Sequence, residues 1–169
     1  LDGSGKSYER ALTINPDFAE AYNNLGIVLN KLGKHNIALE NYNRALIIQP
    51  NYAEAHYNLG NALAGSGQLE SGIASYKQAI EINSNYAEAY YSLGNTFKAL
   101  NQVDTALKNY EQAIAINPDY AEAHFKLALI YKDIDQLDRA IICNEQALMI
   151  NPSYAESYCN LGVIYKELG

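Results

Sequence analysis

The sequence is poor in the residues that disulfide-stapled, metal-binding and membrane-spanning proteins need. Its 169 residues include only two cysteines and three histidines. Cys143 and Cys159 lack a CxxC spacing, so two reduced thiols in a reducing compartment are expected. No apolar run approaches the roughly 20 residues of a membrane-spanning helix. We therefore expect no disulfide framework, no membrane partner and a cytoplasmic location.

Positive charge is also scarce. Lysine and arginine number 12 against 19 aspartates and glutamates, which gives a net charge of −7 and a pI of about 4.9. A protein that binds nucleic acid normally presents a basic face, so this balance predicts no nucleic-acid partner. The chain is nevertheless 49% hydrophobic and 18% charged, a composition that predicts a folded protein.

Proline occurs four times, and its spacing is regular. Pro16, Pro50, Pro118 and Pro152 fall on a lattice of 34 residues, with Ser84 in the remaining place. Each is followed by a similar phrase: DFAEAYNNLG, NYAEAHYNLG, NYAEAYYSLG, DYAEAHFKLA or SYAESYCNLG. A fixed period of this length is typical of a solenoid. We expect one array over residues 1–169: the second helix of a truncated repeat at 1–18, full repeats at 19–52, 53–86, 87–120 and 121–154, and the first helix of another repeat at 155–169.

The stretch GSGKS at residues 3–7 matches the end of a phosphate-binding loop, G-x-x-x-x-G-K-[ST]. The first glycine of that motif would fall before Leu1, and no apolar strand precedes the stretch. In the repeat register, Ser4 aligns with Ala38, and Tyr8 aligns with Tyr42. The stretch is therefore expected to be helical, and we expect no binding of ATP or GTP.

Each repeat carries two helical patterns. Apolar and small residues follow a helical spacing in the first half, as at Tyr22, Leu25, Gly26 and Leu29, and again in the second half. One column of small residues is expected to let the partner helix approach closely: Gly26, Gly60, Gly94, Ala128 and Gly162. Another column suits the left-handed turn that ends a helix: Gly33, Gly67, Asn101 and Asp135.

A polar residue precedes a glutamate by three positions at the start of every first helix. The pairs are Asp17 and Glu20, Asn51 and Glu54, Asn85 and Glu88, Asp119 and Glu122, and Ser153 and Glu156. This spacing predicts a capping box, in which the glutamate bonds back to the backbone at the positive end of the helix. Capping therefore accounts for five carboxylates that could otherwise suggest metal binding or catalysis.

These columns resemble those of the tetratricopeptide repeat (TPR) family, in which an aromatic residue, L-G, a tyrosine-like residue, A, an aromatic residue, A and P recur at this spacing. The phrases NPDFAEAYNNLG and YAESYCNLGVIYKELG further resemble the repeats of O-GlcNAc transferases and their Spindly-type relatives. The resemblance implies an all-α, right-handed superhelical solenoid of antiparallel helix pairs. It also implies that the first helices line a concave groove that binds other proteins.

A face beside the packing stripe of the first helices is expected to meet the ligand. Its expected binding residues are Asn23, Asn24, Tyr57, Asn58, Asn61, Tyr91, Ser92, Asn95, Phe125, Lys126 and Asn160, with Ile27, Leu129, Cys159 and Val163 beside them. An asparagine side chain both donates and accepts, so a row of them could hold an extended peptide of any sequence. The O-GlcNAc transferase resemblance implies such a ladder at Asn24, Asn58 and Asn160, interrupted by Ser92 and Lys126. The alternative is that duplication merely copied a soluble surface residue.

No other residue set predicts chemistry. His56 and His124 occupy an aromatic column and are expected to pack, and no catalytic, cofactor-binding or metal-binding set can be assembled. The expected function is a non-enzymatic scaffold that binds a protein or peptide. Two alternatives remain, the substrate-selecting region of a larger enzyme such as a glycosyltransferase, and a homo-oligomeric scaffold. Separately, the truncated ends are expected to self-associate at high concentration.

Two substitutions follow from these patterns. Alanine at Asn58, Asn61 and Asn95 together is expected to weaken partner binding and to leave the fold intact. Asn144 replaces the tyrosine found at Tyr42 and its equivalents, so Asn144→Tyr is expected to raise the melting temperature through about 1.5–3 kcal/mol of regained apolar burial.

Overall fold

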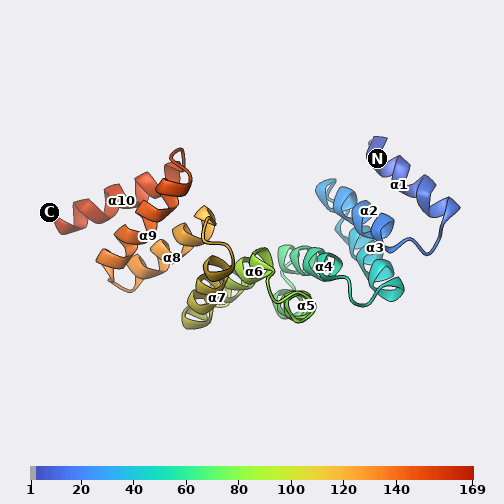
Figure 1. Ribbon diagram of the computed structural model, residues 1–169, viewed down its shortest axis with the longest axis horizontal. Coiled ribbons are helices and arrows are strands. Elements are labelled where there is room, and N and C mark those ends of the chain that lie inside the picture. Colours follow the sequence, from blue (N-terminus) through green and yellow to red (C-terminus); the bar gives the residue numbers. More distant parts are fainter. Residues whose placement is uncertain (1–2) are drawn as a thin grey trace. The chain divides into compact units, whose positions relative to one another are not determined.

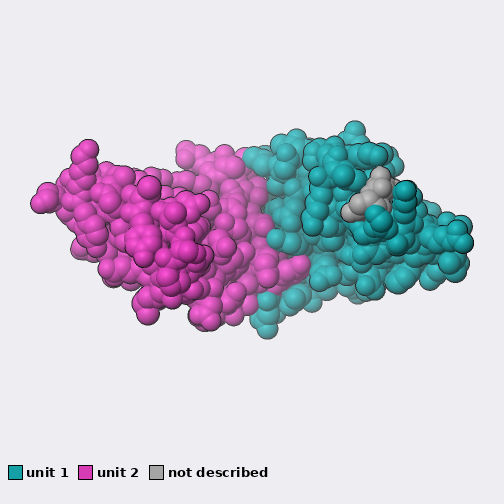
Figure 2. Space-filling view, turned by 90° about the horizontal axis from the view of Figure 1, so that it is seen from above, with its two compact units in different colours: residues 1–85 teal, residues 86–169 magenta. Residues whose placement is uncertain are grey.

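The computed structural model describes residues 3–169, which form ten α-helices and no strand. They divide into two compact units, residues 1–85 and 86–169 (Figure 2). The first unit holds α1 (Gly3–Ile14), α2 (Ala19–Lys31), α3 (His35–Ile48), α4 (Ala53–Gly65) and α5 (Leu69–Ile82). The second holds α6 (Ala87–Ala99), α7 (Val103–Ile116), α8 (Ala121–Asp133), α9 (Leu137–Ile150) and α10 (Ala155–Leu168). The all-α repeat fold expected from the sequence is confirmed, whereas a single array over the whole chain stays a prediction.

Each full repeat is a pair of helices joined by a short turn: α2 with α3, α4 with α5, α6 with α7, and α8 with α9 (Figure 1). The turn contains one residue in the left-handed region in every pair. These residues are Gly33 (φ 74°), Gly67 (φ 84°), Asn101 (φ 57°) and Asp135 (φ 59°). The column that the sequence assigned to this turn is therefore confirmed. Asparagine and aspartate adopt this conformation more readily than other residues that carry a Cβ atom.

The helices of a pair approach closely because small residues face each other across them. A column of alanines on the second helices is completely buried: Ala38, Ala45, Ala79, Ala106, Ala113, Ala140 and Ala147. On the first helices, Gly26 lies so near Tyr42 that a Cβ atom would stand 2.6 Å from the ring. The same close approach recurs between Gly60 and Tyr76, at 2.7 Å. The expected packing role of these glycines is confirmed.

The pair of α8 and α9 has different residues at the positions of this glycine–tyrosine contact. Ala128 replaces the glycine and Asn144 replaces the tyrosine, and both are fully buried. Asn144 donates from Nδ2 to the carbonyl oxygen of Ala140 at 2.8 Å, and its Oδ1 has no hydrogen-bond partner. In α10, which is the first helix of the final half-repeat, a Cβ atom on Gly162 would meet no atom within 4 Å.

The expected capping boxes are wrong. The first helices begin one residue later than that motif requires, so Phe18, Tyr52 and their equivalents occupy the N-cap positions and make no side-chain cap. Four asparagines instead accept a bond at Oδ1 from the backbone N–H two residues on: Asn15 from Asp17, Asn83 from Asn85, Asn117 from Asp119, and Asn151 from Ser153, at 3.1–3.2 Å. This side-chain turn orders the chain before the helix. The glutamates remain exposed in the first helical turn, where negative charge is still favourable.

Candidate functional site

The stretch that resembles a phosphate-binding loop lies within α1, so it is helical as expected. A phosphate-binding loop needs a non-helical backbone whose N–H groups turn toward the phosphates, and a helix directs those groups along its own axis. Within residues 3–169, no three histidine, cysteine or acidic side chains come together to hold a metal ion. In the same residues, no helix is long and apolar enough to cross a membrane. The site is therefore sought on the face of the first helices.

In each unit we call the surface of the first helices that carries the expected binding residues the first-helix face: α2 and α4 in the first unit, and α6, α8 and α10 in the second. In the first unit, Asn58 of α4 donates from Nδ2 to Oδ1 of Asn23 in α2 at 2.9 Å. Asn23 is 1% exposed, so it offers a ligand almost no surface. Asn24 and Tyr57 are half-buried on this face. The two bonded asparagines, Asn23 and Asn58, thus join neighbouring repeats.

Two further asparagines of this face have a structural partner. Asn61 accepts at Oδ1 from the hydroxyl of Tyr76 at 2.8 Å, and Asn95 accepts in the same way from Tyr110 at 2.9 Å. Both hydroxyls belong to the rings that pack against the glycines. The expectation that alanine at these positions spares the fold is therefore contradicted by the geometry. A spacing of fifteen residues between asparagine and tyrosine in both repeats was the signal in the sequence.

The first-helix face of the second unit is rich in aromatic rings. Tyr91 lies 4.9 Å from Tyr120 and 5.8 Å from Tyr110, measured between ring centroids. The same arrangement recurs in the next repeat, where the rings of Phe125 and Tyr154 meet edge-on with their centroids 5.1 Å apart. Aromatic pairs in such tilted and edge-on arrangements are stabilising beyond the apolar area that they bury. Ser92 is half-buried beside them.

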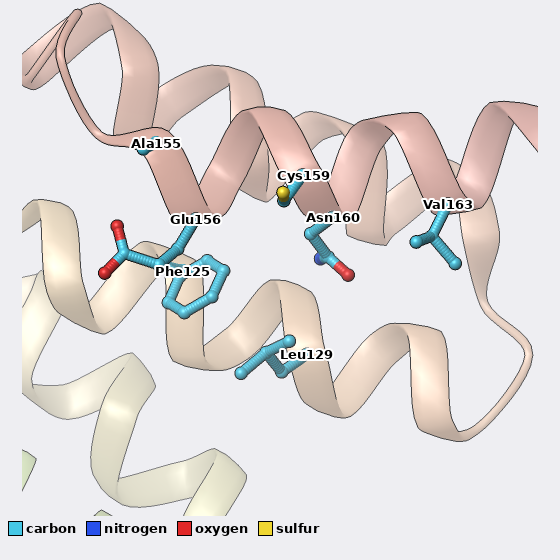
Figure 3. Close-up of a pocket in the computed structure, with 7 residues that line it drawn as sticks. All are labelled: Phe125, Leu129, Ala155, Glu156, Cys159, Asn160 and Val163. Atoms are coloured by element: carbon cyan, nitrogen blue, oxygen red, sulfur yellow. The ribbon is translucent and has the colours of Figure 1, made fainter.

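An open pocket of about 430 Å³ lies between α8 and α10. Phe125 and Leu129 line it from α8, and five residues line it from α10: Ala155, Glu156, Cys159, Asn160 and Val163 (Figure 3). All but two of these side chains are apolar or weakly polar. Figure 3 shows Phe125 and Leu129 on one side of the space, with Asn160 opposite, directed toward them from α10.

Asn160 is the unusual member of this pocket. Its side chain is 5% exposed, and its Nδ2 has no hydrogen-bond partner. In the first unit, the equivalent Asn58 donates to Asn23, but the position of Asn23 is occupied here by Phe125, which has no acceptor. A buried amide donor without a partner costs roughly 1–3 kcal/mol. Nδ2 is enclosed, so it would reach an acceptor in the pocket only after the amide turned about χ2.

A second pocket of about 350 Å³ adjoins the first and shares Leu129 with it. It is lined by Asn95, Lys98, Ala99, Tyr110, Lys126, Leu129 and Ile130. Lys98 is paired with Asp133 at 2.7 Å, and Nζ of Lys126 lies 6.0 Å from the centroid of the Phe125 ring. The face therefore changes from basic on one side of Leu129 to apolar on the other.

Carboxylates lie at the opposite edge of the apolar pocket. The pKa of the Tyr154 hydroxyl is raised to about 12, first by burial and then by negative charge on Tyr91, Glu122 and Glu156. Tyr154 packs against Phe125, so the carboxylates of Glu122 and Glu156 that disfavour its ionised form lie near this edge of the pocket. Burial likewise raises the pKa of the Cys143 thiol, to about 11, whereas Cys159 is exposed at the pocket.

His56 and His124 are half-buried and bonded to the backbone. Each ring donates from Nε2 to a proline carbonyl oxygen at 2.9 Å, His56 to Pro50 and His124 to Pro118, since a carbonyl can only accept. Both side chains therefore have a structural partner, in agreement with the packing expected from the sequence.

Comparisons with known proteins cover the whole chain. A family model described as TPR repeat matches residues 1–33, 28–67, 61–101, 94–135 and 130–169. A crystal structure of MamA is similar at 29% identity and a TM-score of 0.80, covering 92% of this chain and 91% of that one. TTC0263, a thermophilic TPR protein of Thermus thermophilus, is 28% identical with a TM-score of 0.76, over 95% of this chain and 88% of its own.

A third solved structure shares the fold at lower identity. YrrB, described as a TPR protein with an unusual peptide-binding site, is 23% identical with a TM-score of 0.79, over 96% of this chain and 84% of its own. No curated protein matches the chain. The resemblance of the repeats to those of O-GlcNAc transferases stays a prediction.

Proposed function

Because the chain belongs to the tetratricopeptide repeat family, whose arrays serve as protein-interaction scaffolds, we propose that it binds a segment of a partner protein on its first-helix face. The observation that carries the proposal is the pocket between α8 and α10, which is mostly apolar and which Asn160 lines with an amide that lacks a partner at Nδ2. An apolar pocket with one convergent polar group is the usual form of a ligand site.

The exposed apolar side chains of the second helices do not offer a comparable site. Several large ones lie on the second helices, including Ile47 (68% exposed), Ile142 (56%) and Met149 (74%). None of these three side chains lines either pocket of the first-helix face, and single exposed apolar residues are ordinary on a protein surface. The first-helix face of the second unit instead combines two pockets, packed aromatic rings and an amide without a partner.

Position-specific cross-linking tests the proposal. A photoreactive residue is introduced at Cys159 or Val163 on the first-helix face, or at Ile142 or Met149 on the second helices. We expect one partner protein to be cross-linked from the first pair of positions and not from the second. Cross-linking of the same partner from the second-helix positions alone, or equally from both faces, would overturn the proposal.

Self-association is a second candidate, which the surface of α10 supports. Tyr158 and Tyr165 are 57% and 50% exposed, and Gly162 between them has open space around it, whereas Leu161 is buried. We propose that the 169-residue chain associates through this stripe at high concentration. Light scattering over a concentration series tests it, because a strict monomer at millimolar concentration would contradict the proposal.

A further inference from the structure

We infer that the pocket between α8 and α10 selects an apolar side chain that has a lysine or arginine next to it in the partner's sequence. This inference rests on the proposed function and names the chemistry of the bound segment. Three features of the pocket carry it: its apolar walls, the unpartnered amide of Asn160, and the carboxylate of Glu156 at its edge.

The walls determine the central residue of the segment. Phe125, Leu129, Ala155 and Val163 present hydrocarbon to a volume of about 430 Å³. That volume lies toward the lower end of the range of ligand pockets, about 300–1,000 Å³. It therefore suits one large aliphatic or aromatic side chain with its adjoining peptide units.

The amide of Asn160 determines how the segment lies. Its Nδ2 needs an acceptor, and every residue of an extended segment offers a backbone carbonyl oxygen. Nδ2 is enclosed in this structure, so a rotation of the amide about χ2 would first bring it to the pocket surface, where a carbonyl next to the inserted side chain would satisfy it. Asn160 would thus fix the path of the backbone, while the apolar walls select the side chain.

The charges at the edge determine the neighbouring residue. Glu156 lines the pocket with an exposed side chain, and it forms no ion pair within residues 3–169. No lysine, arginine or histidine lines this pocket, since Lys126 lines the adjacent one. A basic residue beside the apolar one would meet Glu156, and the net charge of −7 favours the same sign of ligand.

Capped tripeptides test this selection on the full 169-residue chain. The probes are acetyl-Ala-Leu-Lys-amide, acetyl-Ala-Leu-Glu-amide and acetyl-Ala-Ser-Lys-amide. Nuclear magnetic resonance follows the side-chain amide of Asn160 and the methyl groups of Leu129 and Val163 during titration. We expect the Leu-Lys probe to shift these signals saturably, and the Ser-Lys probe to bind about tenfold more weakly because it buries less hydrocarbon.

The Leu-Glu probe isolates the charge. We expect it to bind at least about threefold more weakly than the Leu-Lys probe at low salt, and we expect the difference to shrink at high salt. Alkylation of Cys159 gives a second readout, since an occupied pocket should slow its reaction with iodoacetamide. Cys143 is the internal control, because it does not line the pocket.

Matched variants separate the pocket from the fold. Val163→Trp should fill the pocket, and Asn160→Leu should remove the donor without removing a satisfied hydrogen bond, so both should abolish the shifts at an unchanged or higher melting temperature. Glu156→Gln should remove the preference for lysine over glutamate, whereas Glu54→Gln should not.

Two results would overturn the inference: no saturable shift with the Leu-Lys probe at millimolar concentration, or equal affinity for the Leu-Lys and Leu-Glu probes. Neither result decides the proposed function. A partner cross-linked from the first-helix face that leaves the signals of Asn160 and Leu129 unchanged would overturn the inference alone.

Discussion

A Cβ atom on Gly94 would lie 2.6 Å from Cε1 of Tyr110, so the absence of a side chain at Gly94 makes room for the tyrosine ring. The same relationship explains the different pair in the next repeat. Ala128 has the Cβ atom that Gly94 lacks, and Asn144 is too short to reach it as a ring would. The two positions are therefore coupled, and each residue type requires its own partner.

This coupling reverses the effect that the sequence predicts for Asn144→Tyr. We expect the single substitution to lower the free energy of unfolding, because the new ring would collide with the side chain of Ala128. Ala128→Gly alone should also be destabilising, by roughly 1 kcal/mol, since glycine disfavours a helix interior. The double variant should recover stability, with a coupling energy of about 1–3 kcal/mol in urea denaturation. Additive effects of the two substitutions would show that the ring has another place to pack.

Gly94→Ala and Gly162→Ala should have opposite effects. The first places a Cβ atom against a buried ring, and overpacking of this kind typically costs about 1–3 kcal/mol. The second places it in open space on an exposed helix, where alanine is favoured over glycine by up to about 1 kcal/mol. Thermal denaturation monitored by circular dichroism distinguishes them. A lower melting temperature for both variants would contradict the packing account.

Removal of the tyrosine hydroxyl should matter only where an asparagine accepts from it. Tyr110→Phe leaves Oδ1 of Asn95 without its donor and should cost about 0.5–1.5 kcal/mol. Tyr42→Phe should cost less, because Ile27 occupies the place of the asparagine in that repeat. For the same reason, Asn95→Ala should destabilise the protein whether or not a partner is bound. Equal losses for the two phenylalanine variants in urea denaturation would argue against these hydrogen bonds.

The buried tyrosines should make the fold sensitive to alkali. Burial raises the pKa of Tyr42 to about 12, whereas a tyrosine in the unfolded chain titrates near 10. The unfolded state therefore loses its proton first, so the contribution of Tyr42 to stability is complete below about pH 10 and is lost as the pH rises toward 12. The pKa of Tyr110 is shifted in the same direction by burial.

Unfolding free energies measured between about pH 9 and about pH 12 check this expectation. Tyr42→Phe should flatten the decline in that interval, and the exposed Tyr158 provides a control, since Tyr158→Phe should leave the decline unchanged. A decline that is the same in all three proteins would show that Tyr42 does not contribute to it.

The two thiols should differ strongly in reactivity. With a pKa of about 11, only about one Cys143 side chain in a thousand is a thiolate at pH 8, and the thiol is also half-buried. Cys159 is exposed. We expect iodoacetamide to modify Cys159 first in the folded protein, with a large excess over Cys143 by mass spectrometry. Urea should equalise the two rates, and equal rates in the folded protein would contradict the burial of Cys143.

The sequence alone predicts the helices, the turns and the close approach of the partner helix at Gly26, because all of these depend on spacing within one repeat. It does not predict that Asn58 bonds to Asn23, since that contact depends on how one first helix lies against the next. Nor does it predict the pocket at Asn160. The amide of Asn160 lacks a partner because Phe125, at the place of Asn23, offers no acceptor, and such a mismatch becomes visible only when the two helices are side by side.

The hydrogen bond between Asn58 and Asn23 has a consequence for chimeric arrays assembled from these repeats. The glycine–tyrosine contacts are kept when a repeat is moved, because both partners belong to the same 34-residue repeat, here called a cassette. The asparagine pair does not, because its members belong to adjacent cassettes. Shuffling the order of repeats would therefore preserve each hairpin while it changed which amides are left without a partner. The junctions between cassettes, rather than the cassettes themselves, are where new binding specificities would be created.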